Sequence, residues 1–495
     1  MEEQHRHKTR ARLVVPTRSD ALLSRWTELV GGRLGFRTAP GVVTPGFFTV
    51  DRVLILLTVV AALIAMAATS YCRLNGWDAA AAYYATCSSG IPTALSGAAF
   101  AHGSLPLFTP GAPFGHPVLL SLVAALTSWA VPGAVPAQRA LSYFDLNAVL
   151  IVALWMGTVI LVARLARRRA WDAAMVALAP GIITSAFLGW DLWAVFAVTV
   201  AMLCFARHRP AWAGIWIGLG AGFALYPLLL PVALLLLAVR SGRFRELLFT
   251  LTATVVTLLA VNAPVAVVNP GAFRAVVGSV IPGGAGASSI WEAWNLIAAR
   301  LGHPVLGTTQ VTVGTLAAFL ALLLVIAGVT LTAPRRPRLA QVLFLLVMAA
   351  VLCAPGYPPQ AVLWLVPLVA LARPVWRDFL LWQAAEILRW AAQSMHLAAV
   401  TGGAGPQHTI DDPYYACAIL LHLGVGLYLM VRVVGDMLSP DGDIVRAGGA
   451  DDPQGGVFDG GPDRAFVLRA RRAPSSRTAG TARRSGHRHG PAARP

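Results

Sequence analysis

The sequence predicts an all-α, polytopic membrane protein. Of its 495 residues, 57% are hydrophobic and only 12% are charged, about half the charged fraction of ordinary soluble domains. The apolar residues form long runs, and in lipid each run must satisfy its backbone hydrogen bonds internally, as a helix does. Arginines gather in the short joints between the runs, as is typical of cytoplasmic loops. The net charge of +17 therefore indicates membrane orientation, and nucleic acid is not an expected partner.

The apolar runs predict about twelve transmembrane helices, although several are shorter than the roughly 20 residues of a straight span. They lie near residues 53–71, 143–164, 172–188, 192–206, 212–225, 227–240, 246–268, 311–332, 339–354, 360–372, 376–397 and 414–434. If the basic N-terminus is cytoplasmic, every arginine-rich joint and the arginine-rich C-terminus are cytoplasmic as well. Lys8 is the only lysine, and the heavy use of Arg, Ala, Gly, Pro and Val is typical of a GC-rich bacterial genome. We therefore expect a multi-pass protein of a bacterial plasma membrane.

One further apolar run, residues 118–131, conflicts with this topology if it crosses the membrane. It would place the joint at 164–169 outside. The run is short and is bracketed by Pro117 and Pro132. We therefore expect it to be re-entrant or to lie at the outer surface.

Three regions follow from this pattern. Residues 1–52 form a basic cytoplasmic N-terminal segment, and residues 53–435 form the transmembrane domain, with a first outer loop at 72–142. Residues 436–495 are rich in Gly, Pro, Asp and Arg. Because such a composition buries little apolar surface, we expect this segment to be a disordered cytoplasmic tail.

The longest early polar stretch, residues 71–117, contains two of the five cysteines, Cys72 and Cys87. Outside the membrane these two residues can form a disulfide. It would close a loop of about 15 residues and contribute roughly 3 kcal/mol in the chain-entropy model. Two unpaired thiols are the alternative.

Ionisable residues near membrane depth are costly, so each is a candidate for function. The outward-facing acids are Asp78, Asp145, Asp191 and Glu292. Asp145 and Asp191 are each expected to begin a helix, so either one can instead serve only as a helix cap. Asp78 precedes a helical-looking run of alanines and can be a cap as well, and Glu292 can instead face water on an interfacial amphipathic helix. The neighbouring tryptophans have a similar alternative, because tryptophan is common at membrane interfaces.

These acids suit glycosyl transfer from a lipid-phosphate donor. A carboxylate acts as general base on an acceptor hydroxyl, while arginine or histidine offsets the charge of the departing phosphate. The sequence contains no glycine-rich phosphate loop with its lysine, no CxxC and no HExxH, so we expect neither a metal nor a cofactor.

The order of motifs resembles the bacterial family 87 glycosyltransferases, from about Val53 to Asp463. The pieces that carry the resemblance are the stretch 72–92, FDLNAVL, LARRRAWDAA, GWDLWAV, LYPLLLP, NAPVAVVNPGAF, SIWEAWN, YPPQAVLWLVPLVALARPVWRDF and DDPYYACAILLH. The family includes polyprenol-phosphate-mannose-dependent mannosyltransferases of the GT-C class. The resemblance therefore implies a GT-C-like bundle, a polyprenyl-phosphate sugar donor as substrate, and an inverting hexosyltransferase without a nucleotide sugar.

The resemblance also implies a catalytic acid in the first outer loop. Asp78 is the only acid between Asp51 and Asp145, so it is the expected base, with Asp191 as the second catalytic acid. The expected substrate-binding residues are Arg73, His102 and His116 for phosphate, Trp77, Trp190 and Tyr226 for sugar or lipid, and Asp145, Glu292 and Gln360. The expected partners are membrane lipid, the donor, and a lipid or glycan acceptor of the cell envelope at the outer leaflet.

Several charged positions of the family are missing. Gly90 and Gly115 stand where relatives commonly have an acid, in Ser-Asp-Ile-Pro and Glu-Tyr-Pro-Val-Leu respectively. Ala224 replaces a lysine before the Tyr-Pro turn, and the lysine expected before the later proline-rich turn is absent from residues 354–357. Two alternatives therefore stay open: a weak or inactive relative that binds polyprenyl lipid or a partner enzyme, and a transporter.

Overall fold

The structure, a computed structural model, describes residues 13–27, 49–77, 79–95, 105, 107–108, 116–131, 135–280, 283–402, 405–447 and 449–465. Within these ranges the regular elements are all helices, in agreement with the all-α prediction. Five helical stretches are long and apolar enough to cross a membrane: 50–68, 136–177, 244–268, 308–332 and 406–438. Shorter apolar helices accompany them. These features support a membrane protein, while the number of crossings stays a prediction.

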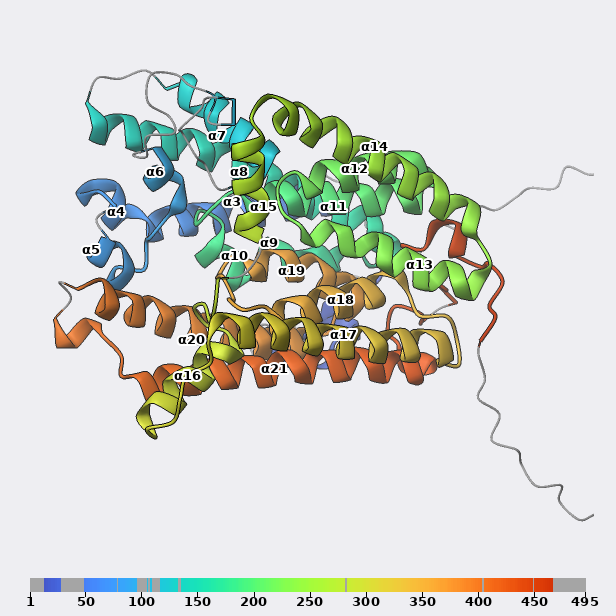
Figure 1. Ribbon diagram of the computed structural model, residues 1–495. Coiled ribbons are helices and arrows are strands. Elements are labelled where there is room, and N and C mark those ends of the chain that lie inside the picture. Colours follow the sequence, from blue (N-terminus) through green and yellow to red (C-terminus); the bar gives the residue numbers. More distant parts are fainter. Residues whose placement is uncertain are drawn as a thin grey trace, which may run out of the picture.

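Most of the longer helices run along one direction, horizontally in Figure 1. The half drawn in blue and green contains α3 (Val50–Ala68), α8 (Pro136–Ala166), α11 (Asp191–Ala206), α12 (Pro210–Ala221), α13 (Leu229–Ser241) and α14 (Phe244–Val268). The half drawn in yellow and orange contains α17 (Thr308–Thr332), α18 (Leu339–Cys353), α19 (Ala361–Ala372), α20 (Trp376–Thr401) and α21 (Asp412–Leu438).

The two ends of this bundle differ. The end at the left of Figure 1, which we call the loop end, carries α4 (Ser70–Asn75), α5 (Ala79–Tyr84), α6 (Gly90–Leu95), α7 (Val118–Trp129) and α16 (Ile290–Arg300). Nearby α15 (Pro270–Val280) follows α14. The opposite end, which we call the tail end, carries the arginine-rich joints and the short helices α1 (Pro16–Ser19), η2 (Arg167–Ala173), η5 (Pro440–Gly442) and η6 (Gly456–Phe458). The remaining short helices are α9 (Ala174–Ala177), α10 (Pro180–Ser185), η3 (Tyr226–Leu228) and η4 (Pro406–His408).

The core is centred on α18 and α19. Nearly all side chains of these two helices are buried, as expected for helices that are apolar on every face. In contrast, α14 and α17 expose many large apolar side chains, among them Leu248, Leu259 and Leu324. Such surfaces are suited to lipid, which is as apolar as the side chains themselves.

Small residues set the closest helix contact, between α12 and α14. Gly214 and Gly218 are four residues apart on α12, and a β-carbon at Gly214 would lie 2.2 Å from the carbonyl oxygen of Thr250. Thr254 Oγ1 also hydrogen-bonds to the Gly214 carbonyl at 3.2 Å. This small-xxx-small spacing is typical of helices whose backbones touch in a membrane.

One expected span is not a single helix. The run at 172–188 is divided into the end of η2, α9, and α10, which begins at Pro180. Proline has no backbone N–H to donate and disfavours a helical residue before it, and Ala179 is accordingly extended. The apolarity of this run was apparent from the sequence, but its division by Pro180 was missed.

The run at 118–131 forms the helix α7, which has 12 residues. At 1.5 Å per residue this is about 18 Å, well short of the roughly 30 Å of a bilayer core. The length is compatible with the predicted re-entrant or surface position, which stays a prediction.

Part of the segment expected to be a disordered tail is packed against the bundle. Residues 436–438 complete α21, and the stretch 439–465, which we call the C-terminal strap, crosses the tail end. Its acids form ion pairs with arginines from several joints: Asp443 with Arg338, Asp451 with Arg336, Asp459 with Arg167, and Asp463 with Arg240. The prediction of disorder was therefore wrong for 439–447 and 449–465, while residues 448 and 466–495 lie outside the described part.

Candidate active site at the loop end

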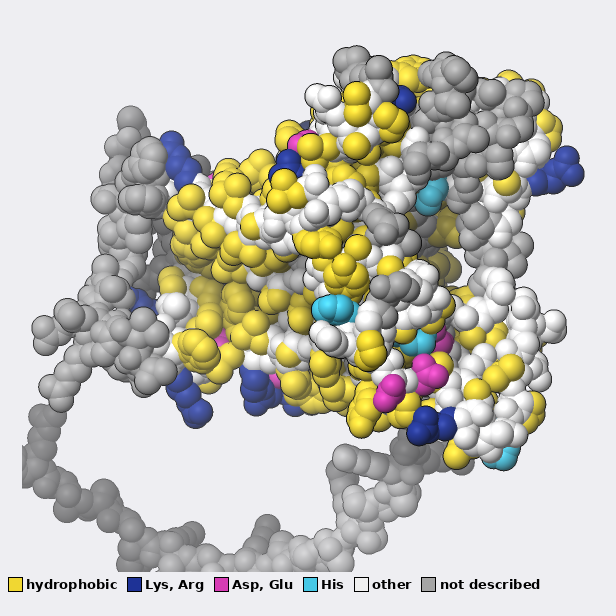
Figure 2. Space-filling model, turned by 90° about the vertical axis from the view of Figure 1, so that its left-hand side faces the viewer, with side chains coloured by type: hydrophobic (Ala, Val, Ile, Leu, Met, Phe, Trp, Pro, Cys, Tyr) yellow, Lys and Arg dark blue, Asp and Glu magenta, His cyan; other side chains and the backbone are white. Residues whose placement is uncertain are grey.

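A cavity of about 340 Å³ opens at the loop end of the bundle, the face that Figure 2 shows. Figure 2 also shows acidic and histidine side chains close together on one part of this face. The cavity is walled by α5, α6 and α20 and by the turns at 188 and 359–360. Its lining combines aromatic rings with hydroxyl and amide groups: Trp77, Ala82, Tyr83, Ser88, Ser89, Gly90, Thr93, Leu188, Pro359, Gln360, Trp390, Gln393, Ser394 and Leu397.

The α5–α6 wall is anchored at both ends. A disulfide joins Cys72 to Cys87, the pair for which the sequence left a bridge or two thiols open. Ser89 Oγ then donates to the Phe187 carbonyl at 2.6 Å, and the Gly90 N–H donates to the Leu188 carbonyl at 2.8 Å. These links hold residues 88–93 against the turn before α11.

Gly90 lies in this wall at a position where relatives commonly have an acid. It is one of the positions at which the family resemblance leads us to expect a carboxylate, and it lines the cavity. A β-carbon here would be 3.3 Å from the Leu188 carbonyl oxygen. The cavity thus has glycine where relatives would place an acid.

A face of α20 forms the opposite wall. Trp390, Gln393, Ser394 and Leu397 line the cavity, and their spacing of three, four and seven residues places them on one side of a helix. Gln393 and Ser394 are 5% and 6% exposed. These residues were not predicted as site residues, because the run 376–397 was predicted only as an apolar span.

Of the predicted site residues, Trp77 and Gln360 line the cavity. The Trp77 ring packs against Phe144 of α8, with a centroid separation of 5.1 Å. Gln360 lies in the turn before α19, and its Oε1 has no hydrogen-bond partner among the described residues. Both residues therefore have positions that suit substrate contact.

Asp191 and Gln360 both lie close to Gly189, and Asp191 is not itself among the lining residues. A β-carbon placed on Gly189 would be 3.2 Å from Asp191 Oδ2 and 3.6 Å from Gln360 Nε2. The other carboxylate oxygen accepts a hydrogen bond from Trp364 Nε1 at 3.0 Å. The Trp364 ring in turn stacks on Tyr226 at 4.7 Å, so the predicted residues Asp191 and Tyr226 share one partner behind the cavity wall.

Arg73 and Asp145 bind each other. Arg73 Nε and Nη2 donate to the two carboxylate oxygens of Asp145 at 3.1 and 2.7 Å. Both side chains are partly exposed, at 31% and 40%. A phosphate that reached Arg73 would therefore share it with a carboxylate.

The helix-cap alternative has different outcomes for the two aspartates. Asp145 lies well inside α8, which begins at Pro136, so the expectation that it begins a helix was wrong. Asp191 does begin α11 and lies in its first turn, where a carboxylate favours the positive end of the helix dipole, so for Asp191 this alternative stays open. Asp191 also binds Trp364, and Asp145 binds Arg73.

Trp190 and Glu292 support the structure behind the cavity. Trp190 is 3% exposed and donates from Nε1 to Asn147 Oδ1 at 2.8 Å. Glu292 Oε2 accepts a hydrogen bond from the Tyr415 hydroxyl at 2.9 Å and another from the Ser288 N–H. Neither residue is among the lining side chains, so their predicted contact with substrate has no support in this geometry.

The last three predicted site residues are Asp78, His102 and His116, and the structure places only His116. Asp78 and His102 are outside the described residues, so the structure does not place the expected base. His116 precedes α7, and its carbonyl accepts a hydrogen bond from Ser121 Oγ. Asp78 is adjacent to Trp77, which lines the cavity.

The polar residues within the apolar run of α20 could have indicated from the sequence that one face of this helix lines a cavity. Glu386 and Arg389 are both almost fully buried and form an ion pair, and Gln393 follows one turn later. Ionisable residues within a membrane span commonly face the bundle interior or a cavity. Applied to this run, that rule would have indicated the polar face of α20.

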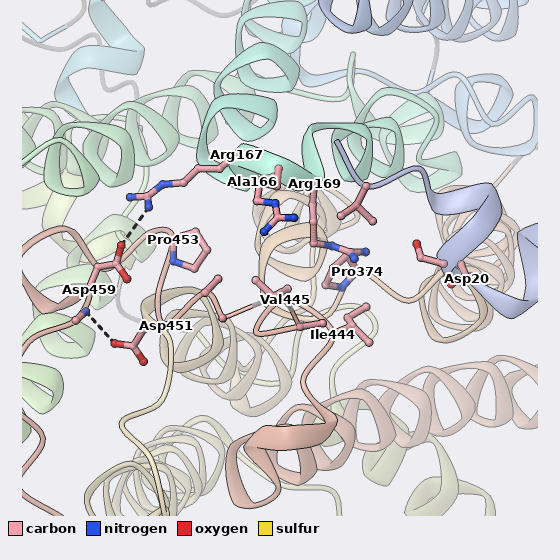
Figure 3. Close-up of a pocket in the computed structure, with 17 residues that line it drawn as sticks. Asp20, Ala166, Arg167, Arg169, Pro374, Ile444, Val445, Asp451, Pro453 and Asp459 are labelled. Atoms are coloured by element: carbon pink, nitrogen blue, oxygen red, sulfur yellow. Dashed lines mark hydrogen bonds and ion pairs between the residues drawn. The ribbon is translucent and has the colours of Figure 1, made fainter. Parts of the chain in front are cut away.

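A larger cavity, of about 710 Å³, lies at the tail end between the N-terminal segment, η2 and the C-terminal strap (Figure 3). Arg167 pairs with Asp459 across it at 3.1 Å, and Asp20 accepts a hydrogen bond from the Trp376 N–H. Its described lining includes no aromatic side chain. We interpret it as a seam between packed segments, and the smaller aromatic cavity as the candidate active site.

A third hollow is an apolar groove of about 270 Å³ between α7 and α14. Val118, Leu119, Leu122, Val261, Pro264 and Val265 are among its lining residues. Its walls carry almost no polar surface, so the groove suits a hydrocarbon chain.

The described residues contain no group of three or more His, Cys, Asp or Glu side chains that would suit a metal ion.

Comparison with known proteins adds one finding. Residues 124–355 match the model of glycosyltransferase family 87, the family that the sequence motifs resemble. The matched segment includes Asp145, Asp191, Tyr226 and Glu292 and ends just before the turn that carries Gln360. No curated protein matches the chain.

Proposed function

Because residues 124–355 match the model of glycosyltransferase family 87, we propose that the protein transfers a sugar of mannose type from a polyprenyl-phosphate donor to a lipid or glycan acceptor. The observation that carries this proposal is the loop-end cavity. Two tryptophans, Trp77 and Trp390, line it together with the amides of Gln360 and Gln393. The family itself supports only a membrane glycosyltransferase, so the donor and acceptor are part of the proposal.

The cavity has the composition of a carbohydrate site. Its volume of about 340 Å³ is within the range of small-ligand pockets. Aromatic faces can cover the apolar side of a sugar ring, and a few placed polar groups fix its orientation. Ser88, Ser89 and Thr93 add hydroxyl groups to the α5–α6 wall.

The proposed reaction is a single inverting displacement. The acceptor hydroxyl oxygen forms a bond to the anomeric carbon while the bond from that carbon to the phosphate oxygen breaks. The hydroxyl proton passes to a carboxylate, and polyprenyl phosphate leaves with the electron pair. Asp78 is the proposed base from the family resemblance, and Asp191, which like Gln360 lies close to Gly189, is the proposed second acid. No cofactor takes part in this scheme.

The donor would use two further features of the loop end. Arg73 is the described cation near Trp77, and in this role its guanidinium would offset the phosphate charge. The apolar groove between α7 and α14 would hold part of the polyprenyl chain. Membrane lipid surrounds the exposed apolar faces of α14 and α17.

We further propose that the loop end faces outward from a bacterial plasma membrane and that both termini are cytoplasmic. The arginine-rich joints at the tail end support this orientation through their positive charge. The Cys72–Cys87 disulfide at the loop end supports it as well, because disulfides persist in oxidising compartments.

The test is transfer of labelled mannose from a short-chain polyprenyl-phosphate mannose by membranes that contain the full chain. Loss of a general base is expected to lower the rate by about 10²- to 10⁴-fold, so Asp78→Asn should abolish most transfer. Asp191→Asn should also reduce the rate, whereas Asp51→Asn, at the tail end, should not.

Three other results would change the assignment. Transfer that is undiminished in Asp78→Asn would exclude Asp78 as the base while keeping the enzyme. Donor binding without transfer to any of several acceptors would favour a non-catalytic lipid-binding relative. Flux of the sugar across sealed vesicles without transfer would favour a transporter.

A further inference from the structure

The orientation of the Gln393 amide is fixed by its buried neighbours. Gln393 Oε1 accepts hydrogen bonds from Arg389 Nη1 at 2.7 Å and from Ser288 Oγ at 3.1 Å. Arginine has only donors, so the amide cannot flip without placing two donors against each other. The amide oxygen therefore faces Arg389, and the NH₂ group is left for another partner.

That partner is not among the described residues. Gln393 lines the cavity and is 5% exposed, and its Nε2 forms no hydrogen bond within the described part of the chain. Ser394, the next residue, is 6% exposed and also lines the cavity. Its hydroxyl forms no hydrogen bond to any described residue. Both groups open onto the cavity, so a molecule bound there can supply their missing partners.

Arg389 and Ser288, the two residues that orient Gln393, are themselves held by further contacts. Arg389 Nε and Nη2 both donate to Glu386 Oε2 at 3.3 Å, and the guanidinium lies over the Tyr357 ring at 4.6 Å. Ser288 is held by the Tyr415 hydroxyl, which is 2.9 Å from its backbone nitrogen. These contacts bring together α20, α21, the loop before α16 and the turn before α19.

The contacts of Arg389 also determine which ligand chemistry fits the cavity. The Arg389 charge is neutralised by Glu386, and its Nη1 is occupied by Gln393 and Ser288. The groups that reach the cavity are therefore a neutral amide and a hydroxyl. Beside the Trp390 ring, they suit the hydroxyl oxygens of a sugar better than a phosphate, which prefers charged donors.

We propose that Gln393 and Ser394 form the subsite that binds ring hydroxyls of the transferred sugar and that Gln393, oriented by Arg389 and Ser288, determines which sugar is accepted. The proposal deepens the proposed function and rests on it for the identity of the sugar. Gln393 acts by binding substrate, and no proton transfer is assigned to it.

The test measures binding and transfer separately, with the full chain in lipid nanodiscs. Equilibrium binding of labelled short-chain polyprenyl-phosphate mannose gives Kd, and transfer gives KM and kcat. In Gln393→Glu the oxygen that faces Arg389 is retained and the N–H donors are lost. We expect Kd to rise about tenfold, the usual effect of losing one good hydrogen bond, and Ser394→Ala to raise it a few-fold.

Deoxy sugars distinguish direct contact from a structural effect. A donor that lacks the hydroxyl bound by Gln393 should bind the wild type about tenfold more weakly and bind Gln393→Glu no worse than mannose does. Gln383→Met is the matched control, because Gln383 is buried on the same helix and its Oε1 accepts a hydrogen bond from the Gly181 N–H, away from the cavity. It should leave Kd unchanged.

The proposal is overturned if Gln393→Glu has the wild-type Kd for the mannose donor and for every deoxy donor, even when transfer proceeds normally. It is also overturned if the wild type does not bind the probe. Conversely, Gln393-dependent binding without transfer would support the subsite and refute the transferase. If Gln393→Glu does not yield folded protein, the deoxy series with Ser394→Ala decides, and unchanged Kd values there would refute the proposal.

Discussion

Removal of the Asp443 carboxylate should release the C-terminal strap from the bundle. Asp443 Oδ2 and Oδ1 accept hydrogen bonds from Arg338 Nε at 2.7 Å and Nη2 at 3.0 Å, and the two side chains are 2% and 0% exposed. Gln341 Nε2 donates to the same carboxylate. In Asp443→Ala the guanidinium would stay buried without its counter-charge, which typically costs about 3–5 kcal/mol.

A loss of stability of this size should increase the fraction of molecules in which the strap is open, and trypsin can detect that fraction. Arg446 is 8% exposed, so trypsin can cut after it only when the strap has opened. Where reclosing is faster than cleavage, the cleavage rate follows the open population. The expected increase in the cleavage rate is thus roughly 10²- to 10⁴-fold. It is measured by mass spectrometry of the fragment that ends at Arg446.

Asp51→Ala is the matched control at the same end of the molecule. Its partner Arg164 is 54% exposed, and exposed pairs contribute about 0–1 kcal/mol. Cleavage after Arg446 should therefore change less than about tenfold. If Asp443→Ala is cut as slowly as the wild type, the buried pair does not hold the strap and the reasoning is refuted.

Three further predictions concern the cavity and the tail end. Trp390→Ala should raise KM for the sugar donor about tenfold through loss of the stacking face, while Trp212→Ala, on an exposed surface, should not; equal KM values would contradict the assigned cavity. Replacing Cys72 and Cys87 by serine should lower the free energy of unfolding by roughly 3 kcal/mol for a loop of this size, measured in mixed micelles, and an unchanged value would show that the bridge adds no stability. Burial raises the pKa of Asp452 from 3.8 to about 6, so the strap is favoured while this carboxyl is protonated; its stability should be greatest below about pH 4 and fall as pH rises through 6, by on the order of 3 kcal/mol. Thermal unfolding at pH 5 and 7.5 should show about half of this loss, about 1.4 kcal/mol, in the wild type and none in Asp452→Asn. Identical profiles for the two proteins would exclude Asp452 as its source.

The sequence predicted where the long helices lie better than it predicted which of them line the candidate site. Apolar runs located the long helices of the described residues, because lipid-facing and core-facing helices are both continuous stretches of hydrophobic residues. The apolar runs did not locate helices of the loop end such as α5, α6 and α16. The division at Pro180 was missed because the averaged apolarity of 172–188 concealed one proline. Trp77 and Gln360 were found because they lie in polar loops, where function was expected.

The α20 wall and the strap were missed for different physical reasons. Gln393 and Ser394 lie on a helix whose overall composition predicts a span, and only their position relative to α6 gives them a cavity to face. The strap has a composition typical of disorder, but its aspartates are matched to arginines that lie far away in the sequence, such as Asp463 with Arg240. Pairing over such separations depends on the folded arrangement of helices.

The strap also has a consequence for the order of synthesis. Arg240, Arg336 and Arg338 are made before Asp443, Asp451 and Asp463 exist, so each of these buried cations must wait for a counter-charge that the ribosome adds more than 100 residues later. A chain that stopped at residue 438 would contain every described α-helix and still leave those arginines without their aspartate partners. The charges of the strap therefore separate a chain in which these arginines are paired from one in which they are not.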